Sequence, residues 1–201
     1  MESWYQVAPG NLDFHKFRSP VKAQLLETAI ELERNERKMR MNTKMNSVMK
    51  TLHTAVASGK LTGAVNLNSE LLKLIEPGFT MKDGAVLLKT QEKLAMDIRP
   101  DNFPDLTGYE CFVNHIHIED YLGDAERGSN SLLEQGLAFA NKIVEELSSL
   151  YLGKPFKVIV ATNESGCSVR FHMIRNGENW LSDDLDEYGQ EAILVLDISP
   201  I

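Results

Sequence analysis

Residues 156–174 of the chain, FKVIVATNESGCSVRFHMI, decide the fold class that the sequence predicts. Residues 156–162 are rich in β-branched side chains, which favour extended backbone. Residues 163–166 are typical of a turn, and apolar and polar side chains then alternate, as in a strand with one buried face. Just beyond, Asn176-Gly177 is a pair typical of a two-residue hairpin turn. The stretch therefore predicts neighbouring strands of one sheet.

Further elements of the same sheet domain are expected on either side. Residues 129–152 carry apolar side chains at the 3.6-residue spacing of an amphipathic helix, and Gly153 suits its end. Residues 192–198, AILVLDI, are almost all apolar, as in a strand covered on both faces. Residues 109–118, YECFVNHIHI, alternate with a period of two and predict another strand. The second half of the chain is thus predicted to form a β-α-β-β-β sheet domain.

The first half of the chain has the spacing of helices. Apolar residues recur at helical intervals over residues 21–57, which predicts one long helix or two consecutive ones. Residues 67–75 predict a shorter helix, and residues 80–98 a further one. Within the latter, residues 94–98 also alternate, so a strand there remains an alternative.

A boundary is expected from Arg99 to Asp105, where two prolines, Asn102 and two aspartates interrupt both patterns. It would separate a mainly helical region, residues 1–105, from an α+β sheet domain, residues 106–201, unless the two pack as one unit. The predicted class is therefore α+β, a helical N-terminal region packed with a C-terminal sheet domain.

Composition and length are those of a soluble globular protein, with 201 residues, 43% hydrophobic and 25% charged. The N-terminus lacks the basic and apolar regions of a signal peptide, and no window approaches 18 uninterrupted apolar residues. We therefore expect a cytoplasmic protein that does not bind membranes. Cys111 and Cys167 have no metal-binding spacing and are expected to be free thiols.

Acidic side chains are concentrated at the C-terminal end. The formal net charge is −8, and residues 176–201 hold seven Asp or Glu and no Lys or Arg. An acidic loop with aromatic residues favours a protein-binding surface, because aromatic anchors and a field of one sign both promote association. The expected partner-binding residues in this loop are Trp180, Asp183, Asp184, Asp186, Glu187 and Tyr188. A smaller set follows the expected strand at residues 109–118, namely Glu119, Asp120 and Tyr121. The simpler alternative is a solubilising loop with Trp180 in the core.

These features favour a stoichiometric inhibitor that binds a basic protein, such as a nuclease toxin domain, in the manner of immunity proteins. The comparison with immunity proteins is a functional analogy. The chain contains no nucleophile elbow, dinucleotide-binding glycine motif or Walker phosphate loop, so no catalytic residue and no cofactor is assigned.

Nucleic acid is not an expected partner, because binding it depends on neutralising phosphates and this chain is acidic. A basic stretch, residues 34–44, is interspersed with glutamates four residues before arginines, as on a solvated helix face. A third hypothesis is a structural subunit that associates through its long N-terminal helix. The charged interruption at residues 33–38 argues against a continuous coiled-coil seam there.

His115 and His117 support the alternative function, a metal-dependent enzyme. Two residues apart on a strand, they would project to the same face roughly 6 to 7 Å apart. Two imidazoles so placed could hold a divalent metal with a third ligand, for which His172 or Glu119 is the candidate. Only five histidines occur in the chain, and none has helical metal-binding spacing.

Overall fold

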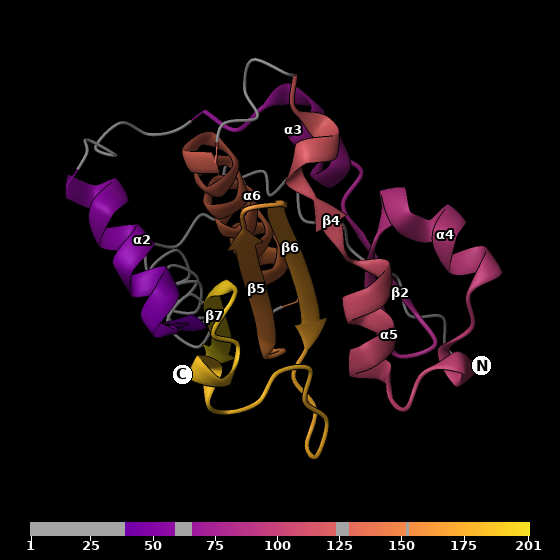
Figure 1. Cartoon of the computed structure of the whole chain (residues 1–201). Helices are drawn as coiled ribbons and strands as arrows, with labels where there is room; N and C mark the ends of the chain where they lie inside the picture. The colour runs from indigo at the N-terminus through magenta and orange to yellow at the C-terminus, as the bar shows by residue number, and fades with distance from the viewer. Residues whose placement is uncertain (1–38, 59–65, 124–128, 152) are drawn as a thin grey trace, which may run out of the picture. The chain divides into compact units, whose positions relative to one another are not determined.

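A five-stranded antiparallel sheet organises the part of the chain that the computed structural model describes, residues 39–58, 66–123, 129–151 and 153–201 (Figure 1). The strand order is β1-β7-β5-β6-β4. The strands are β1 (Met39–Met45), β4 (Ile116–His117), β5 (Phe156–Asn163), β6 (Gly166–Met173) and β7 (Ala192–Pro200). With helices on one face of this sheet, the predicted α+β class is confirmed.

The β5–β6 hairpin forms as the sequence predicts. Val160 pairs with Val169, and the turn is closed where Asn163 pairs with Gly166. The Asn163 side chain accepts a hydrogen bond from the Ser165 N–H at 2.8 Å, which is the local turn chemistry expected of Asn. β7 lies between β5 and β1 and is buried on both faces, as its apolar sequence predicts.

One long helix, α6 (Ser129–Leu150), covers one face of the sheet and lies behind β5 and β6 in Figure 1. Its buried residues include Phe139, Ile143 and Leu147, which join the main core with the inward side chains of the strands. Gly136 allows the close approach, because a Cβ there would lie 2.6 Å from the Cys167 sulfur. The amphipathic helix expected at residues 129–152 is therefore confirmed.

The remaining elements precede α6 in the chain. They are α2 (Ser47–Ser58), α3 (Ser69–Ile75), the hairpin of β2 (Phe79–Lys82) and β3 (Ala85–Leu88), α4 (Glu92–Asp97) and α5 (Leu106–Val113). Short 3₁₀ turns occupy Lys89–Gln91, Pro100–Asn102 and Ile118–Tyr121 before α6, and Leu185–Glu187 after it. The predicted helix at residues 67–75 corresponds to α3, which Asn68 caps by accepting from the Glu70 N–H at 2.8 Å.

Two predicted helical segments are strands instead. Residues 39–45 form β1 and pair with β7. The spacing of their methionines fits both a strand and a helix, and the pairing with β7 selects the strand. Residues 79–88 form the β2–β3 hairpin. Its turn is Asp83-Gly84, with φ of 51° and 82°, a pair of positive φ angles that two-residue hairpin turns require.

The strand predicted at residues 109–118 is wrong for most of its length. Asp105 accepts a hydrogen bond from the Gly108 N–H at 2.7 Å and so caps α5, and Tyr109 and Val113 pack on the β3 side chains. Within residues 109–118, only Ile116 and His117 pair with β6. The hairpin expected at Asn176-Gly177 is also wrong, because the turn there leads into the long loop 174–191.

Met39–Ile201 form one compact unit, and the boundary expected between Arg99 and Asp105 lies inside it. The helix expected from residue 21 lies outside the described residues up to residue 38. Among the helices that the structure describes, none has the length and apolar character needed to cross a membrane.

Candidate functional site

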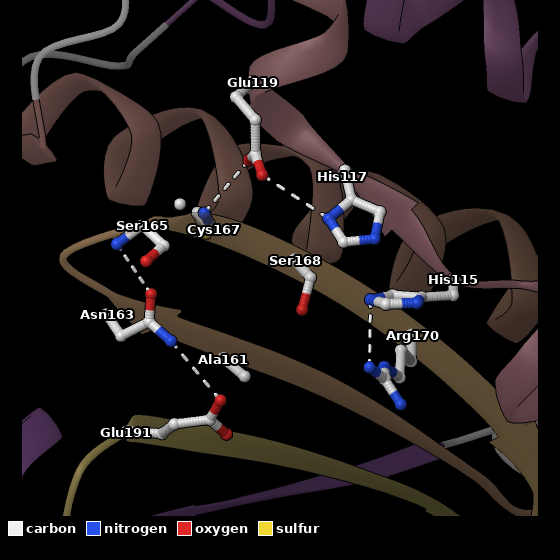
Figure 2. Close-up of a pocket in the computed structure, with 11 residues that line it drawn as sticks. His115, His117, Glu119, Ala161, Asn163, Ser165, Cys167, Ser168, Arg170 and Glu191 are labelled. Atoms are coloured by element: carbon white, nitrogen blue, oxygen red, sulfur yellow. Dashed lines mark hydrogen bonds and ion pairs between the residues drawn. The ribbon is translucent and has the colours of Figure 1, made fainter.

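The sheet face opposite α6 carries a polar recess. Loop 174–191 covers part of this face, where Leu181, Leu185 and Tyr188 pack against Ile159 and its neighbours on β7. Beside the loop lie two adjoining hollows of about 180 and 250 Å³. We name them together the Arg170 recess, after the residue that stands between them. The lining residues common to both hollows are Ala161, Ser168, Arg170 and Glu191 (Figure 2).

Arg170 makes its contacts with uncharged rings. Its Nη2 donates to the Nε2 of His115 at 3.0 Å, and its guanidinium carbon lies 5.1 Å from the centre of the Trp180 ring. The second contact is a cation–π interaction. Within the described residues, no carboxylate forms an ion pair with Arg170, and burial lowers its pKa from the ordinary value.

His115 and His117 lie together, as the sequence predicts, with ring centres 4.2 Å apart. Burial and the nearby Arg170 lower the pKa of His115 to about 4, so its ring is neutral at pH 7. The Nδ1 of His117 lies 3.4 Å from Glu119. In Figure 2 the two rings lie next to each other, with Glu119 beside His117 and Arg170 beside His115.

His172 is not brought to this histidine pair. It is buried on β6, where its Nδ1 lies 3.0 Å from the Met173 carbonyl, and it lines neither hollow. In the described parts of the chain, no three His, Cys, Asp or Glu side chains are placed to hold a metal ion. The metal centre expected from His115, His117 and His172 is therefore not formed by these residues.

The buried His172 predicts a loss of stability in acid. Burial lowers its pKa to about 4 from an ordinary 6.5, so the unfolded chain binds a proton that the folded protein does not. The stabilisation is complete above pH 6.5 and is lost as the pH falls towards 4, by about 3 kcal/mol in the free energy of unfolding.

Urea denaturation between pH 4 and 7 measures this loss. His172→Gln is expected to flatten the pH dependence, and the exposed His53→Gln serves as the matched control. An unchanged pH dependence in His172→Gln would show that other groups cause the acid sensitivity. His115, whose pKa is lowered in the same direction, is expected to contribute a residual slope.

Glu119, Asp120 and Tyr121, the smaller predicted set, differ in their contacts and in their exposure to solvent. The Glu119 carboxylate accepts from the Cys167 N–H at 3.1 Å and fills the space beside Gly166, so it supports the β5–β6 hairpin. Tyr121 packs against the main core, and Asp120 is exposed. Of this predicted acidic set, only Asp120 is fully available at the surface.

The acidic residues of loop 174–191 divide into two groups. Asp184 accepts from the Asp186 N–H at 3.0 Å, and Asp186 accepts from the Ser47 N–H at 2.6 Å, which holds its pKa below the ordinary value. The Tyr188 hydroxyl accepts from the Ser182 N–H at 3.0 Å. These residues fix the loop as well as lining its surface.

The other group makes none of these hydrogen bonds, although Asp184 and Asp186 are exposed as well. Asp183 and Glu187 are exposed, and the side chain of Trp180 keeps 37% of its surface accessible. Trp180 is therefore not tucked into the core, which was the simpler alternative. It lies on the rim of the recess and stacks on Arg170.

Two residues important to this site are missing from the sequence-based prediction. The place of Arg170 on an alternating strand predicts a polar side chain on the outward face. No local pattern indicates that Arg170 forms no ion pair with a carboxylate of the described residues. Asn46 is buried and ties the loop to α2 and β7 through hydrogen bonds to residues about 140 positions away. Such long-range partners leave no local pattern.

Fold and site together define an α+β protein with a helix on one face of an antiparallel sheet and a polar recess on the other. Residues 40–201, almost the whole compact unit, match the model of the Uncharacterized protein PM0498 family, and the chain belongs to this family. A curated relative, Uncharacterized protein PM0498 of Pasteurella multocida (strain Pm70), is 27% identical over 123 residues, covering 56% of this chain and 73% of the relative. No solved structure matches.

Proposed function

We propose that this protein is a stoichiometric inhibitor that binds a basic partner protein, of the immunity type that neutralises a toxin domain such as a nuclease. The observation that supports this function best is the fixed conformation of the acidic loop 174–191. Apolar residues anchor the loop to the sheet, and Asn46 and Ser47 bind its backbone and the Asp186 side chain. A loop already held in place loses little conformational entropy on binding, so more of the contact energy appears as affinity.

Charge and aromatic exposure support the same proposal. The loop presents five carboxylates within nine residues, and no Lys or Arg follows Arg175 in the chain. Their combined field would steer a basic protein over roughly a Debye length, about 8 Å at physiological salt. The exposed Trp180 is the type of side chain that most often anchors an interface. The five carboxylates are Asp183, Asp184, Asp186, Glu187 and Glu191.

Removing the outward charges is expected to weaken partner binding without unfolding the protein. The test variant is Asp183→Asn with Glu187→Gln, since both side chains are exposed while Asp184 and Asp186 hold the loop. Its matched control is Glu76→Gln with Asp101→Asn, which removes the same charge from exposed positions elsewhere. Because screened charge mainly affects association, the rate constant should fall several-fold and depend less on salt.

The measurement begins with affinity purification of the tagged protein from its native cell extract at about 50 and 500 mM salt, where screening differs strongly. The expected result is one basic protein bound at a one-to-one ratio. More of it should be retained at low salt than at high salt, and the control variant should retain more of it than the test variant. Inhibition of that partner's activity at equimolar ratio completes the test. Equal retention by both variants, or the absence of any basic partner, would contradict the proposed function.

A further inference from the structure

Arg170 is a partly buried cation with unused hydrogen-bond donors. A guanidinium carries five N–H groups, and among the described residues only the His115 ring accepts one of them. The negative charge of Glu191 acts on Arg170, yet burial outweighs it and the pKa of Arg170 is lowered overall. A partly desolvated cation that makes no ion pair costs free energy, and a bound anion would offset part of that cost.

The carboxylates that line the recess have other partners. Glu119 is bound to the Cys167 N–H and faces His117, and Glu191 accepts from the Asn163 side chain at 3.4 Å. Figure 2 shows Arg170 and Glu191 at different ends of the recess, with the small side chains of Ala161 and Ser168 between them. Space next to the guanidinium is therefore open to a small group.

The second hollow adds an apolar wall. It is lined by Ile159, Leu181 and Ile193 on one side of Arg170, with the Trp180 ring at its rim. Ligand sites commonly combine such a wall with a few polar groups and have volumes of roughly 300–1,000 Å³. Each hollow, of about 180 and 250 Å³, is smaller than that range, so the ligand would have to be small, with a charged end and an apolar end that lie in the two adjoining hollows.

We infer that the Arg170 recess is a binding site for a carboxylate that carries an apolar group. The carboxylate pairs with the guanidinium through parallel N–H donors, a geometry that arginine provides and lysine does not. The apolar group lies against Ile159 and Leu181 beneath Trp180. His115, neutral at pH 7, keeps the guanidinium oriented through its Nε2. The same chemistry occurs in a free organic acid and in the C-terminal residue of a peptide.

Titration calorimetry of the full chain with N-acetyl-leucine and with uncharged N-acetyl-leucinamide tests this site. The acid is expected to bind and the amide to bind at least tenfold more weakly. Arg170→Gln should abolish binding of the acid and Arg170→Lys should restore only part of it, while Arg40→Gln, at an exposed arginine on β1, should have no effect. The comparison of acid with amide on the unaltered protein stands even if a variant at position 170 fails to fold.

A hexapeptide ending in leucine, with a free or an amidated C-terminus, distinguishes the two sources. Tighter binding of the free-terminus peptide than of N-acetyl-leucine identifies a chain terminus as the ligand, and equal binding identifies a small acid. Three results would overturn the inference: the acids bind no better than their amides, neither acid binds, or Arg170→Gln binds the acid as well as the unaltered protein does. These measurements need no partner protein, so their outcome is independent of the proposed inhibitor function.

Discussion

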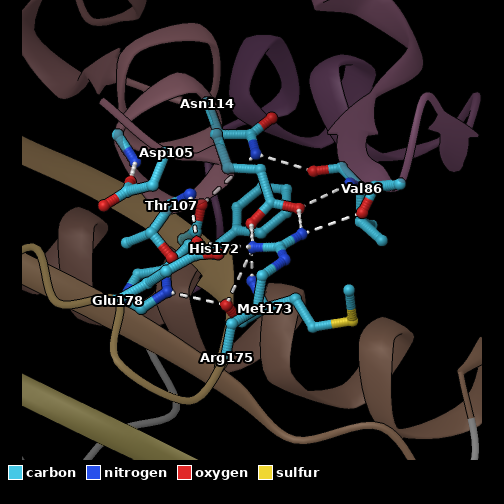
Figure 3. Close-up of polar contacts among 12 residues, drawn as sticks. Val86, Asp105, Thr107, Asn114, His172, Met173, Arg175 and Glu178 are labelled. Atoms are coloured by element: carbon cyan, nitrogen blue, oxygen red, sulfur yellow. Dashed lines mark hydrogen bonds and ion pairs between the residues drawn. The ribbon is translucent and has the colours of Figure 1, made fainter. Parts of the chain in front are cut away.

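Glu110→Ala is expected to lower the free energy of unfolding by about 3 to 5 kcal/mol, the usual cost of removing one partner of a buried ion pair. The Glu110 carboxylate is fully buried on α5. It accepts from the Val86 and Met173 N–H groups at 2.7 and 2.8 Å, and from two nitrogens of Arg175 at 2.8 Å each. Figure 3 labels these three partners. Although burial acts to lower it, the pKa of Arg175 is raised by its hydrogen bonds to Glu110.

The size of this effect follows from what Glu110 joins. Its four hydrogen bonds connect the β2–β3 hairpin, α5 and the end of β6. The substitution removes the acceptor of the buried Val86 N–H and of the partly buried Met173 N–H, and leaves Arg175 with two carbonyl acceptors and the more distant Glu178 carboxylate at 3.9 Å. Asn114, bound to Val86, Leu88 and Phe171, holds the same three elements but does not replace the lost charge.

Urea denaturation at pH 7 measures the loss, with Glu92→Ala at an exposed position of α4 as the control, expected within about 0.5 kcal/mol of the unaltered protein. The double variant Glu110→Leu with Arg175→Met should recover much of the stability, because it leaves no unpaired buried charge. A loss below about 1 kcal/mol in Glu110→Ala would contradict this account, because that is the value of an exposed pair.

Asn46→Ala is expected to cost about 2 to 4 kcal/mol, since it removes a helix cap and leaves buried backbone groups without partners. The Asn46 Oδ1 accepts from the Met49 N–H at 2.9 Å, which caps α2, and from the Ile193 N–H at 3.0 Å on β7. Its Nδ2 donates to the Glu191 carbonyl at 2.7 Å, which holds the end of loop 174–191.

Asn46→Asp separates these roles. Aspartate keeps the acceptor for Met49 and Ile193 but places a buried carboxylate oxygen against the Glu191 carbonyl to which Nδ2 donates, so loop 174–191 should be released while the cap of α2 is kept. Chemical denaturation gives the stabilities, and hydrogen exchange of the amides of loop 174–191 reports whether the loop is released. An alanine variant as stable as the unaltered protein would show that Asn46 does not organise this region.

The local sequence pattern determined the central elements of the fold. The β-branched run at residues 156–162, the turn after it, the amphipathic helix and the apolar final strand each carry a period or a turn signal that needs no distant partner. Because three strands and the helix that covers them lie within the last 75 residues, the α+β class could be predicted from local patterns.

Tertiary contacts decided the ambiguous segments. Residues 39–45 fit both a strand and a helix, and pairing with β7 selected the strand. At residues 106–113, the Asp105 cap and packing on β3 selected a helix over a strand. A short apolar segment satisfies more than one period, so its structure depends on which surface buries it.

For the site, the sequence identified the composition of the surface and the pairing of His115 with His117. The roles of individual residues depended on partners far along the chain. Asp186 binds the backbone of Ser47, Glu119 supports the hairpin at Cys167, and Arg170 contacts the rings of His115 and Trp180. Whether a charged side chain is free, used internally or left without a counterion depends on distances between segments, which only the folded chain defines.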